Sequence, residues 1–334
     1  MVKLICGPMA TLSHQAFRML VERFGGCDEY FTEMINAPSL LNMGPFEKFY
    51  LLDGPEPKKI VWQLTGNKKE KLAEAAYFLA AKNGIGIDLN MGCCAPQIYS
   101  TGAGIAWMLK DLKETEATVK AVKERLNDYE KETGKHVRLS VKCRLGGEDF
   151  TEKSFFNFAE VLVKNGVELI SLHPRTIKEK ERNLPRWEWG KKLYEHFGKK
   201  IPVYLNGCIK DETSAKKALA AFPEVAGLMI SRAAAQAPWI FARLSGKILE
   251  QSKIDAEELA LAFIDYVEEF QPKEFYKTRL QRFFSYYCKN FSFAHYFSIQ
   301  MLNCSTLEES RNSVKEYFAK QGSDRILQIK KETD

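Results

Sequence analysis

The 334-residue sequence lacks any apolar run near the roughly 20 residues that a bilayer span requires. Its opening stretch, MVKLICGPMA, is interrupted by Gly7 and Pro8 and does not have the pattern of a secretory signal peptide. Its eight cysteines include no CxxC pair and no zinc-like spacing, which argues against a structural metal. These absences predict a cytoplasmic protein with reduced thiols, no metal and no membrane association.

Charge of one sign is in only modest excess, with 49 Lys and Arg against 43 Asp and Glu and a net charge of +6. The segment 273–289, KEFYKTRLQRFFSYYCK, is more distinctive because it holds five basic residues, one acidic residue and six aromatics. Such a segment suits contact with an anionic polymer that has stackable bases. An amphipathic helix with packed aromatics and solvated charges would have the same composition, so the segment alone is compatible with both interpretations.

Short apolar runs rich in β-formers alternate with stretches of helical periodicity through the first two thirds of the chain. Alternation of this kind predicts parallel strands joined by helices. No GxGxxG follows the first run, which disfavours a Rossmann fold. We therefore expect a (β/α)8 TIM barrel over residues 1–244, with strands in the runs 4–9, 29–35, 60–66, 85–92, 137–146, 168–175, 201–207 and 227–232.

The pattern changes after Pro238, where segments of helical periodicity follow one another without strand signals between them. No low-complexity linker separates this part from the barrel. The sequence thus predicts a second, all-helical domain over residues 245–334 that packs on the barrel, with helices in the segments 254–270, 276–291 and 307–321.

Polar residues stand at the carboxyl ends of nearly all the predicted strands, where the active sites of such barrels lie. Each has a structural explanation by itself: Lys142 could be a surface charge, and His173 could be a core histidine. Their shared place at one rim favours a bound ligand, with a phosphate held after strands seven and eight. The residues at this rim are Pro8, Met9, Gln63, Asn90, Cys93, Lys142, Arg144, His173, Arg175, Asn206, Gly207, Ser231 and Arg232.

With these motifs the sequence resembles the tRNA-dihydrouridine synthase (Dus) family, FMN-dependent barrels that reduce uridine in RNA. The resemblance spans about residues 4 to 242. It is carried, in the order of the family, by the segments GPMATLSHQAFR, QLTG, DLNMGCCAPQIYSTGAGIAWMLKD, VKCRLG, LHPRT, IPVYLNGCI and LMISRAAAQAPWIF.

The resemblance implies a role for each matched position. Cys93 is similar to the family's general acid, and Asn90 to a contact with the uracil ring. FMN contacts are implied for Pro8, Met9, Gln63, Lys142, His173, Asn206, Gly207, Cys208, Ser231 and Arg232. RNA contacts are implied for Arg144, Arg175, Lys277, Arg279 and Arg282. NADPH or NADH would reduce the flavin, the substrate would be tRNA or another structured RNA, and a monomer is the default state.

The chemistry explains why a thiol suits position 93. Hydride addition to C6 of uracil builds negative charge at C5, which then needs a proton from the opposite face of the ring. A thiol has an ordinary pKa of about 8.5, so it is mostly protonated at neutral pH and can donate this proton. Lys142, beside N1 of the flavin, would stabilise its anionic reduced form.

The chain departs from the family pattern at several positions. Cys94 stands in the place of a proline, and an inert small residue, a second acid and a redox partner all remain open for it. The first motif reads GPMATLSH where the family has a G-x-T-D ending. Pro174, Ser231 and Ala233 replace glycines, and Cys208 replaces an aspartate. These replacements would impair phosphate binding only where the backbone needs a positive φ.

Two alternatives to an RNA-reducing enzyme stay open. One is an FMN barrel that reduces a free pyrimidine or another small enone, although a small substrate would not need the basic C-terminal helices. The other is a non-catalytic RNA-binding paralogue that has lost its flavin. Bound flavin would separate this last alternative from both enzymes.

Overall fold

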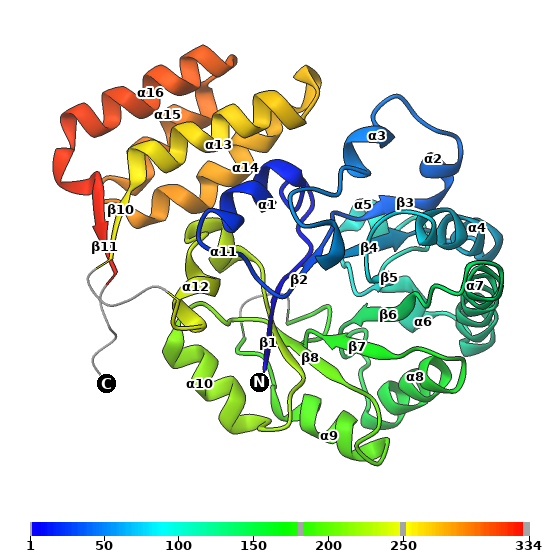
Figure 1. Ribbon diagram of the computed structural model, residues 1–334. Helices are drawn as coiled ribbons and strands as arrows, with labels where there is room; N and C mark the ends of the chain where they lie inside the picture. Colours follow the sequence, from blue (N-terminus) through cyan, green and yellow to red (C-terminus); the bar gives the residue numbers. More distant parts are fainter. Residues whose placement is uncertain (1, 180–182, 248–251, 330–334) are drawn as a thin grey trace.

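Eight parallel strands close into a barrel in the computed structural model, which describes residues 2–179, 183–247 and 252–329 (Figure 1). Strand β1 pairs with β2 on one side and β9 on the other, and β2 also pairs with β4, so the sheet has no open edge. The predicted TIM barrel is confirmed, and each predicted run overlaps one barrel strand: β1 (Lys3–Cys6), which begins one residue before its run, β2 (Glu29–Phe31), β4 (Ile60–Thr65), β5 (Gly86–Met91), β6 (Arg138–Cys143), β7 (Leu169–Leu172), β8 (Val203–Asn206) and β9 (Gly227–Ile230). A short strand, β3 (Ile35–Asn36), extends the sheet along β4.

Helices surround the barrel because neighbouring strands are parallel. After each strand, a helix on the outside carries the chain back to the start of the next strand. Two of them begin with capping boxes, Thr151 with Ser154 in α8 and Asp211 with Ser214 in α10. Their buried faces pack on the outer side of the strands. The outer helices are α1 (Gln15–Glu22), α4 (Lys69–Ala80), α7 (Leu112–Thr133), α8 (Glu152–Lys164), α9 (Glu188–His196) and α10 (Glu212–Ala221), followed after β9 by α11 (Arg232–Gln236) and α12 (Ile240–Leu244).

Shorter helices lie within the connections between these elements. These are α2 (Ala37–Leu41), α3 (Glu47–Tyr50), η1 (Pro57–Lys59), α5 (Pro96–Tyr99) and α6 (Ala106–Leu109). Helices α2 and α3 come after β3, α5 and α6 come after β5, and η1 directly precedes β4.

The amino-terminal end of the barrel is filled by side chains. Glu29 is 1% exposed and makes two hydrogen bonds to Arg138, at 3.0 and 2.7 Å. Its Oε1 also accepts from Lys3 Nζ and from the Tyr204 hydroxyl. Burial alone would raise the pKa of Glu29, but the contacts with Arg138, Lys3 and Tyr204 together outweigh it and lower the pKa. An apolar layer lies in the interior, formed by Ile5, Phe31, Val61, Leu169, Tyr204 and Met229.

The C-terminal region is helical, as expected, but it is not purely so. Its first and last described strands, β10 (Lys253–Asp255) and β11 (Ile326–Gln328), form an antiparallel pair that the sequence pattern did not predict. Three-residue strands are too short to show a period of two. The elements between them are α13 (Ala256–Phe270), η2 (Lys273–Phe275), α14 (Tyr276–Tyr287), η3 (Cys288–Asn290), α15 (Ala294–Asn303), α16 (Leu307–Lys320) and η4 (Gly322–Asp324).

The helical region packs directly on the barrel. Helix α13 lies over α1 (Figure 1), and the Phe263 ring stacks on His14 with the ring centroids 6.2 Å apart. Aromatic side chains fill the region's own core, for example Phe297 stacked on Tyr317 at 4.1 Å. The division into two domains near residue 245 remains a prediction, since buried side chains are continuous from one part to the other.

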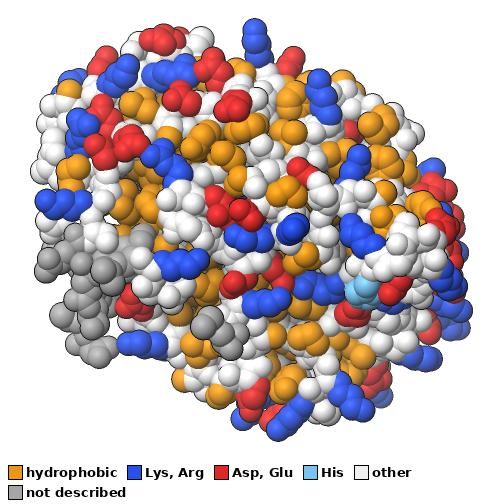
Figure 2. All heavy atoms as spheres, viewed as in Figure 1, with side chains coloured by type: hydrophobic (Ala, Val, Ile, Leu, Met, Phe, Trp, Pro, Cys, Tyr) orange, Lys and Arg blue, Asp and Glu red, His pale blue; other side chains and the backbone are white. Residues whose placement is uncertain are grey.

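The face of the molecule in Figure 2 shows no large patch of one charge sign that would indicate a binding partner. Acidic and basic side chains are mixed across it. Over the described part of the chain, no helix is long and apolar enough to cross a membrane. Within the same residues, no group of three or more His, Cys, Asp or Glu side chains could hold a metal ion.

Candidate active site

A cavity of about 920 Å³ opens at the carboxyl ends of the strands. It is large enough for a cofactor together with part of a substrate. The loops after the strands and the inner face of α14 line it. The structure thus brings together fourteen of the predicted site residues: Pro8, Met9, Gln63, Asn90, Cys93, Lys142, Arg144, His173, Asn206, Gly207, Cys208, Ser231, Arg232 and Arg282.

Strand register explains why the polar side chains meet. Gln63, Asp88 and Ser140 are direct neighbours across β4, β5 and β6, so their side chains form one layer. Asn90 and Lys142 are neighbours two residues further along the same strands, and they form the next layer toward the cavity. Side chains two residues apart in a strand point to the same face, which is here the barrel interior.

A chain of hydrogen bonds crosses these layers and ends at Cys93. Asp88 accepts from Ser140 Oγ at 2.7 Å and from Gln63 Nε2 at 2.8 Å. Gln63 Oε1 accepts from Asn90 Nδ2 at 2.9 Å, and Asn90 Oδ1 accepts from the backbone N–H of Cys93 at 2.9 Å. An ionised carboxylate can only accept, so Asp88 sets the orientation of both amides in turn.

Asp88 was not among the predicted site residues. Burial raises its pKa from 3.8 to about 6, while the hydrogen bonds from Gln63 and Ser140 and the charge of Lys142 act in the opposite direction. The carboxyl group is therefore mostly ionised at neutral pH and protonated in mild acid. Its place two residues before Asn90, on the same face of one strand, is the signal that could have identified it.

Cys93 lies at the cavity with its thiol partly exposed. Burial raises its pKa, although the Ala95 backbone N–H and the nearby Lys142 charge oppose the increase. The group is consequently a neutral thiol at pH 7, the form that can donate a proton. Gly104, at φ +60°, packs closely against the Cys93 backbone. A Cβ atom at this position would lie 2.5 Å from the carbonyl oxygen of Cys93.

Lys142 brings a positive charge into this poorly solvated site. Burial lowers its pKa, the neighbouring Arg144 lowers it further, and Asp88 opposes both. A cation with little solvation is well suited to stabilise negative charge that develops on a bound molecule.

His173 is held as a neutral imidazole. Arg175 Nη1 lies 2.9 Å from His173 Nε2, and because a guanidinium group can only donate, Nε2 must accept and Nδ1 carries the hydrogen. Burial lowers the pKa of His173 well below its usual value, and the charges of Arg144 and Lys142 lower it further. The neutral state and the tautomer therefore follow from the same neighbours.

Arg175 itself is buried, at 1% exposed. Besides His173, it donates to the carbonyl oxygen of Asn183 and, at 3.0 Å, to Cys208 Sγ. The implied RNA contact of Arg175 must be corrected, because its donors are directed to partners within the protein. It orients His173 instead.

The expected phosphate corner combines the ends of β8 and β9. Gly207 has φ +111°, and a Cβ atom there would lie 2.9 Å from the His173 ring. Cys208 adopts φ +54° without being glycine. Ser231, however, has φ −123°, and Ala233 lies within α11, so the loss of glycine at these two positions places no side chain at a positive φ.

The outer wall of the cavity comes from the segment 273–289. Arg282 and Lys289 both lie over the Tyr286 ring, at 5.2 and 5.1 Å from its centroid. All three line the cavity, whereas Phe283 and Tyr287 point into the helical core. The packing interpretation of this segment is thus confirmed for one face. Tyr286 and Lys289 were missed as site residues, although they follow Arg282 at the spacing of one helix face.

The other two basic residues predicted in this segment lie elsewhere. Lys277 is exposed and does not line the cavity. Arg279 is 2% exposed and forms an ion pair with Glu33. An RNA contact by Arg279 must therefore be corrected, because a side chain buried between two elements has no surface to offer.

The fold and this rim define a (β/α)8-barrel enzyme whose chemistry takes place at the carboxyl ends of the strands. The family model for dihydrouridine synthases (Dus) matches residues 4–330, and the chain belongs to this oxidoreductase family. A Synechocystis protein named "Probable tRNA-dihydrouridine synthase 1" is 26% identical over 317 residues, which cover 93% of this chain and 84% of that protein. Proteins named "Probable tRNA-dihydrouridine synthase" from Helicobacter pylori and Staphylococcus aureus are 31% and 25% identical, over 80% and 97% of this chain and 77% and 96% of theirs.

Proposed function

We propose that this protein is a tRNA-dihydrouridine synthase that uses FMN and NADPH to reduce the C5–C6 double bond of a uridine. Its family and the names of its relatives indicate this activity. The observation that carries the proposal within the chain is one cavity lined by a neutral thiol at Cys93, a half-buried cation at Lys142 and a cationic aromatic wall around Tyr286.

The residues present suit a flavin mononucleotide. Pro8, Met9 and Gln63 offer a mixed apolar and polar surface for a ring system. Asn206, Gly207, Ser231 and Arg232 lie at the ends of β8 and β9, where we expect the phosphate. When bound, reduced FMN supplies a hydride for C6 of the base, and NADPH restores its reduced state.

Cys93 would donate a proton to C5 as negative charge builds there. Asn90 holds the Cys93 backbone and keeps a second amide hydrogen, beyond the one given to Gln63, for the uracil ring. Lys142 would hold positive charge near the reacting rings throughout. Cys94 also lines the cavity, but no contact with the hydrogen-bond chain gives it a part in proton transfer.

The outer wall favours RNA over a free pyrimidine. A target base within folded RNA must leave its stack to reach the barrel. Arg282 and Lys289 can contact phosphates while Tyr286 offers a ring for stacking. A small enone would need none of these groups. The non-catalytic alternative is disfavoured because Cys93, Lys142 and His173 all face the cavity and Ser231 does not require a positive φ.

The test begins with the absorption spectrum of the purified protein, with and without added FMN. The flavin is then reduced by NADPH without oxygen, and an unmodified tRNA transcript or free uridine is added. We expect flavin oxidation with the transcript alone, accompanied by dihydrouridine in the digested RNA. Equal oxidation by free uridine would support the small-molecule alternative, and a protein that takes up no FMN would contradict both enzyme functions.

A further inference from the structure

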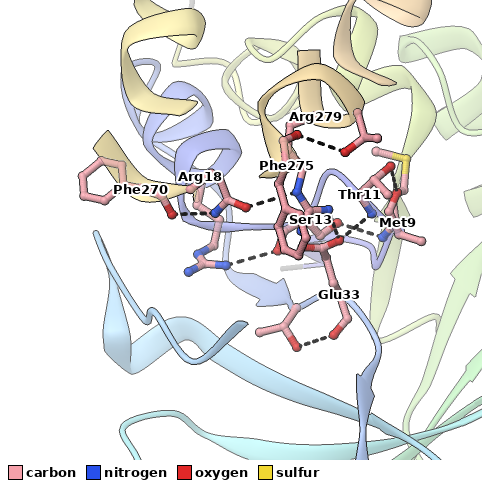
Figure 3. Close-up of polar contacts among 12 residues, drawn as sticks. Met9, Thr11, Ser13, Arg18, Glu33, Phe270, Phe275 and Arg279 are labelled. Atoms are coloured by element: carbon pink, nitrogen blue, oxygen red, sulfur yellow. Dashed lines mark hydrogen bonds and ion pairs between the residues drawn. The ribbon is translucent and has the colours of Figure 1, made fainter. Parts of the chain in front are cut away.

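One buried carboxylate, that of Glu33, contacts two other segments of the chain at once (Figure 3). It follows β2 and is 5% exposed. Its Oε1 accepts from Arg279 Nη1 of α14 at 2.6 Å and also from the backbone N–H of Thr11, in the loop after β1. Three segments that are distant in sequence therefore meet at a single oxygen atom.

Each of these segments also lines the catalytic cavity. Pro8, Met9 and Ala10 precede Thr11 and lie in the cavity wall, as does Met34 next to Glu33. In α14, Arg279 is followed at positions i+3 and i+7 by Arg282 and Tyr286, which form the outer wall. The buried end of this helix face thus holds the ion pair, and the open end faces the cavity.

The backbone conformation of the loop at Thr11 has to be stabilised by contacts with other residues. Thr11 has φ +63°, a conformation that is unusual for a β-branched residue and occurs where the family motif has glycine. Such a conformation persists only when its surroundings determine it. The Glu33 carboxylate holds the Thr11 amide, and Ser13 Oγ holds the Met9 amide at 2.8 Å.

Arg279 is in turn fixed from several sides. Its Nε donates to Gln271 Oε1 at 3.1 Å, and its guanidinium group lies 4.9 Å from the Phe275 ring centroid and 5.8 Å from that of Tyr50. Replacement of a buried ion pair by apolar groups is often neutral or favourable for stability. Stability alone therefore does not account for a charged pair at this place.

We propose that Glu33 and Arg279 are positioning residues that join the RNA-facing wall of α14 to the loop of residues 8–11. The pair keeps this wall and this loop in a fixed relative position, so that the RNA substrate binds in one orientation. The pair touches neither flavin nor base and acts through Thr11 and through α14. This role rests on the proposed function, because it concerns the RNA substrate of the same cavity.

The test uses E33Q, R279M and the double variant E33Q/R279M of the full-length FMN-loaded protein. The single variants leave one buried group without its partner and can lose stability. The double variant removes both charges and should recover the melting temperature. If the pair positions the substrate, kcat/KM for the tRNA transcript stays lower by roughly tenfold or more in the double variant, while flavin reduction by NADPH stays at the wild-type rate. Recovery of both stability and kcat/KM would overturn the proposal.

A second measurement does not depend on the RNA reaction. Amide hydrogen exchange in residues 9–12 should accelerate in R279M, although the substitution lies in the helical region. R311M is the matched control, because Arg311 pairs with Asp265 inside that region, at 2.7 Å. Unchanged exchange in R279M would overturn the link between the two segments. If the wild-type protein is inactive on RNA but R279M still shows faster exchange than wild type, the proposed function is contradicted and the link remains intact.

Discussion

The side chain of Asn90 accepts a hydrogen bond from the backbone N–H of Cys93 at 2.9 Å. The amide that makes this contact is itself oriented by Gln63, and Gln63 by the buried carboxylate of Asp88. The position of the thiol at the cavity is thus set by three side chains on two neighbouring strands. This rigid support explains how a loop residue can hold a defined place for proton donation.

Replacement of the two cysteines should separate their roles. We expect C93A to lower kcat for tRNA reduction by roughly 10²- to 10⁴-fold, the usual contribution of a general acid, while C94A retains kcat within about threefold of wild type. Flavin content and NADPH-dependent flavin reduction should be normal in both variants. Single-turnover oxidation of the reduced flavin by tRNA measures the effect. A larger loss in C94A than in C93A would assign the proton to the other thiol.

Asp88 should make stability depend on pH in a defined direction. Its pKa is raised in the folded state from 3.8 to about 6, so the folded protein binds a proton more tightly than the unfolded chain. Stability should therefore fall as the pH rises from about 4 to 6, and the loss should persist above pH 6. At about 1.4 kcal/mol for each pKa unit, this amounts to about 3 kcal/mol.

The variant D88N isolates this effect. Its amide can still accept from Gln63 while Ser140 rotates to accept in turn, so the hydrogen-bond chain is preserved. The difference in free energy of unfolding between D88N and wild type should grow in favour of D88N between pH 4 and 7. Denaturant unfolding at several pH values measures it, and a constant difference would show that Asp88 has no raised pKa.

Gly207 should be required for the shape of the flavin site. In G207A the new Cβ atom would press against His173, which is 2.9 Å away, and the residue would also keep φ +111°. We expect the dissociation constant for FMN to increase by about tenfold, which corresponds to ~1.4 kcal/mol. G198A is the control, since Gly198 has φ +60° with no atom within 4 Å of an added Cβ. Equal FMN binding by the two variants would contradict the contact.

His173 should remain neutral through the physiological range. Burial and the charges of Arg144 and Lys142 lower its pKa, so the folded state loses stability only as the pH falls below the unfolded pKa of about 6.5. Nitrogen NMR of labelled protein should show hydrogen on Nδ1 from pH 6 to 8, the tautomer that Arg175 imposes. Hydrogen on Nε2 would rule out the Arg175 contact.

The outer wall should contribute electrostatically to RNA binding. Neutralisation of both cations in R282Q/K289Q should weaken tRNA binding and reduce the slope of log K against log salt by up to about two. K131Q is the control, because Lys131 is 79% exposed on α7, outside the barrel. An unchanged slope in R282Q/K289Q would exclude phosphate contacts by these residues.

Several features could be predicted from the sequence because they depend on neighbours in the chain. The eight barrel strands were found from apolar runs, and Cys93 and Lys142 from their places at strand ends. The pairing of β10 with β11 was missed, since three residues carry no periodicity. Asp88 was missed because its importance comes from Gln63 on the neighbouring strand.

The basic segment shows where sequence reasoning ends. Arg279 and Arg282 lie three residues apart in one helix, and both were predicted to bind RNA. One is buried against Glu33, and the other faces the cavity. Periodicity identifies residues that share a helix face, but it does not say how far along that face the protein's own packing extends.

The sequence by itself determined the barrel, the helical character of the C-terminal region and the identity of the polar strand ends, because these follow from local periodicity and short motifs. The tertiary structure alone decided the strand register that joins Asp88 to Cys93, and it placed Glu33 where Thr11 and Arg279 meet. The two contacts of Glu33 join residues 22 and 246 positions apart. Such contacts form only when packing brings distant segments together, and no local pattern encodes them.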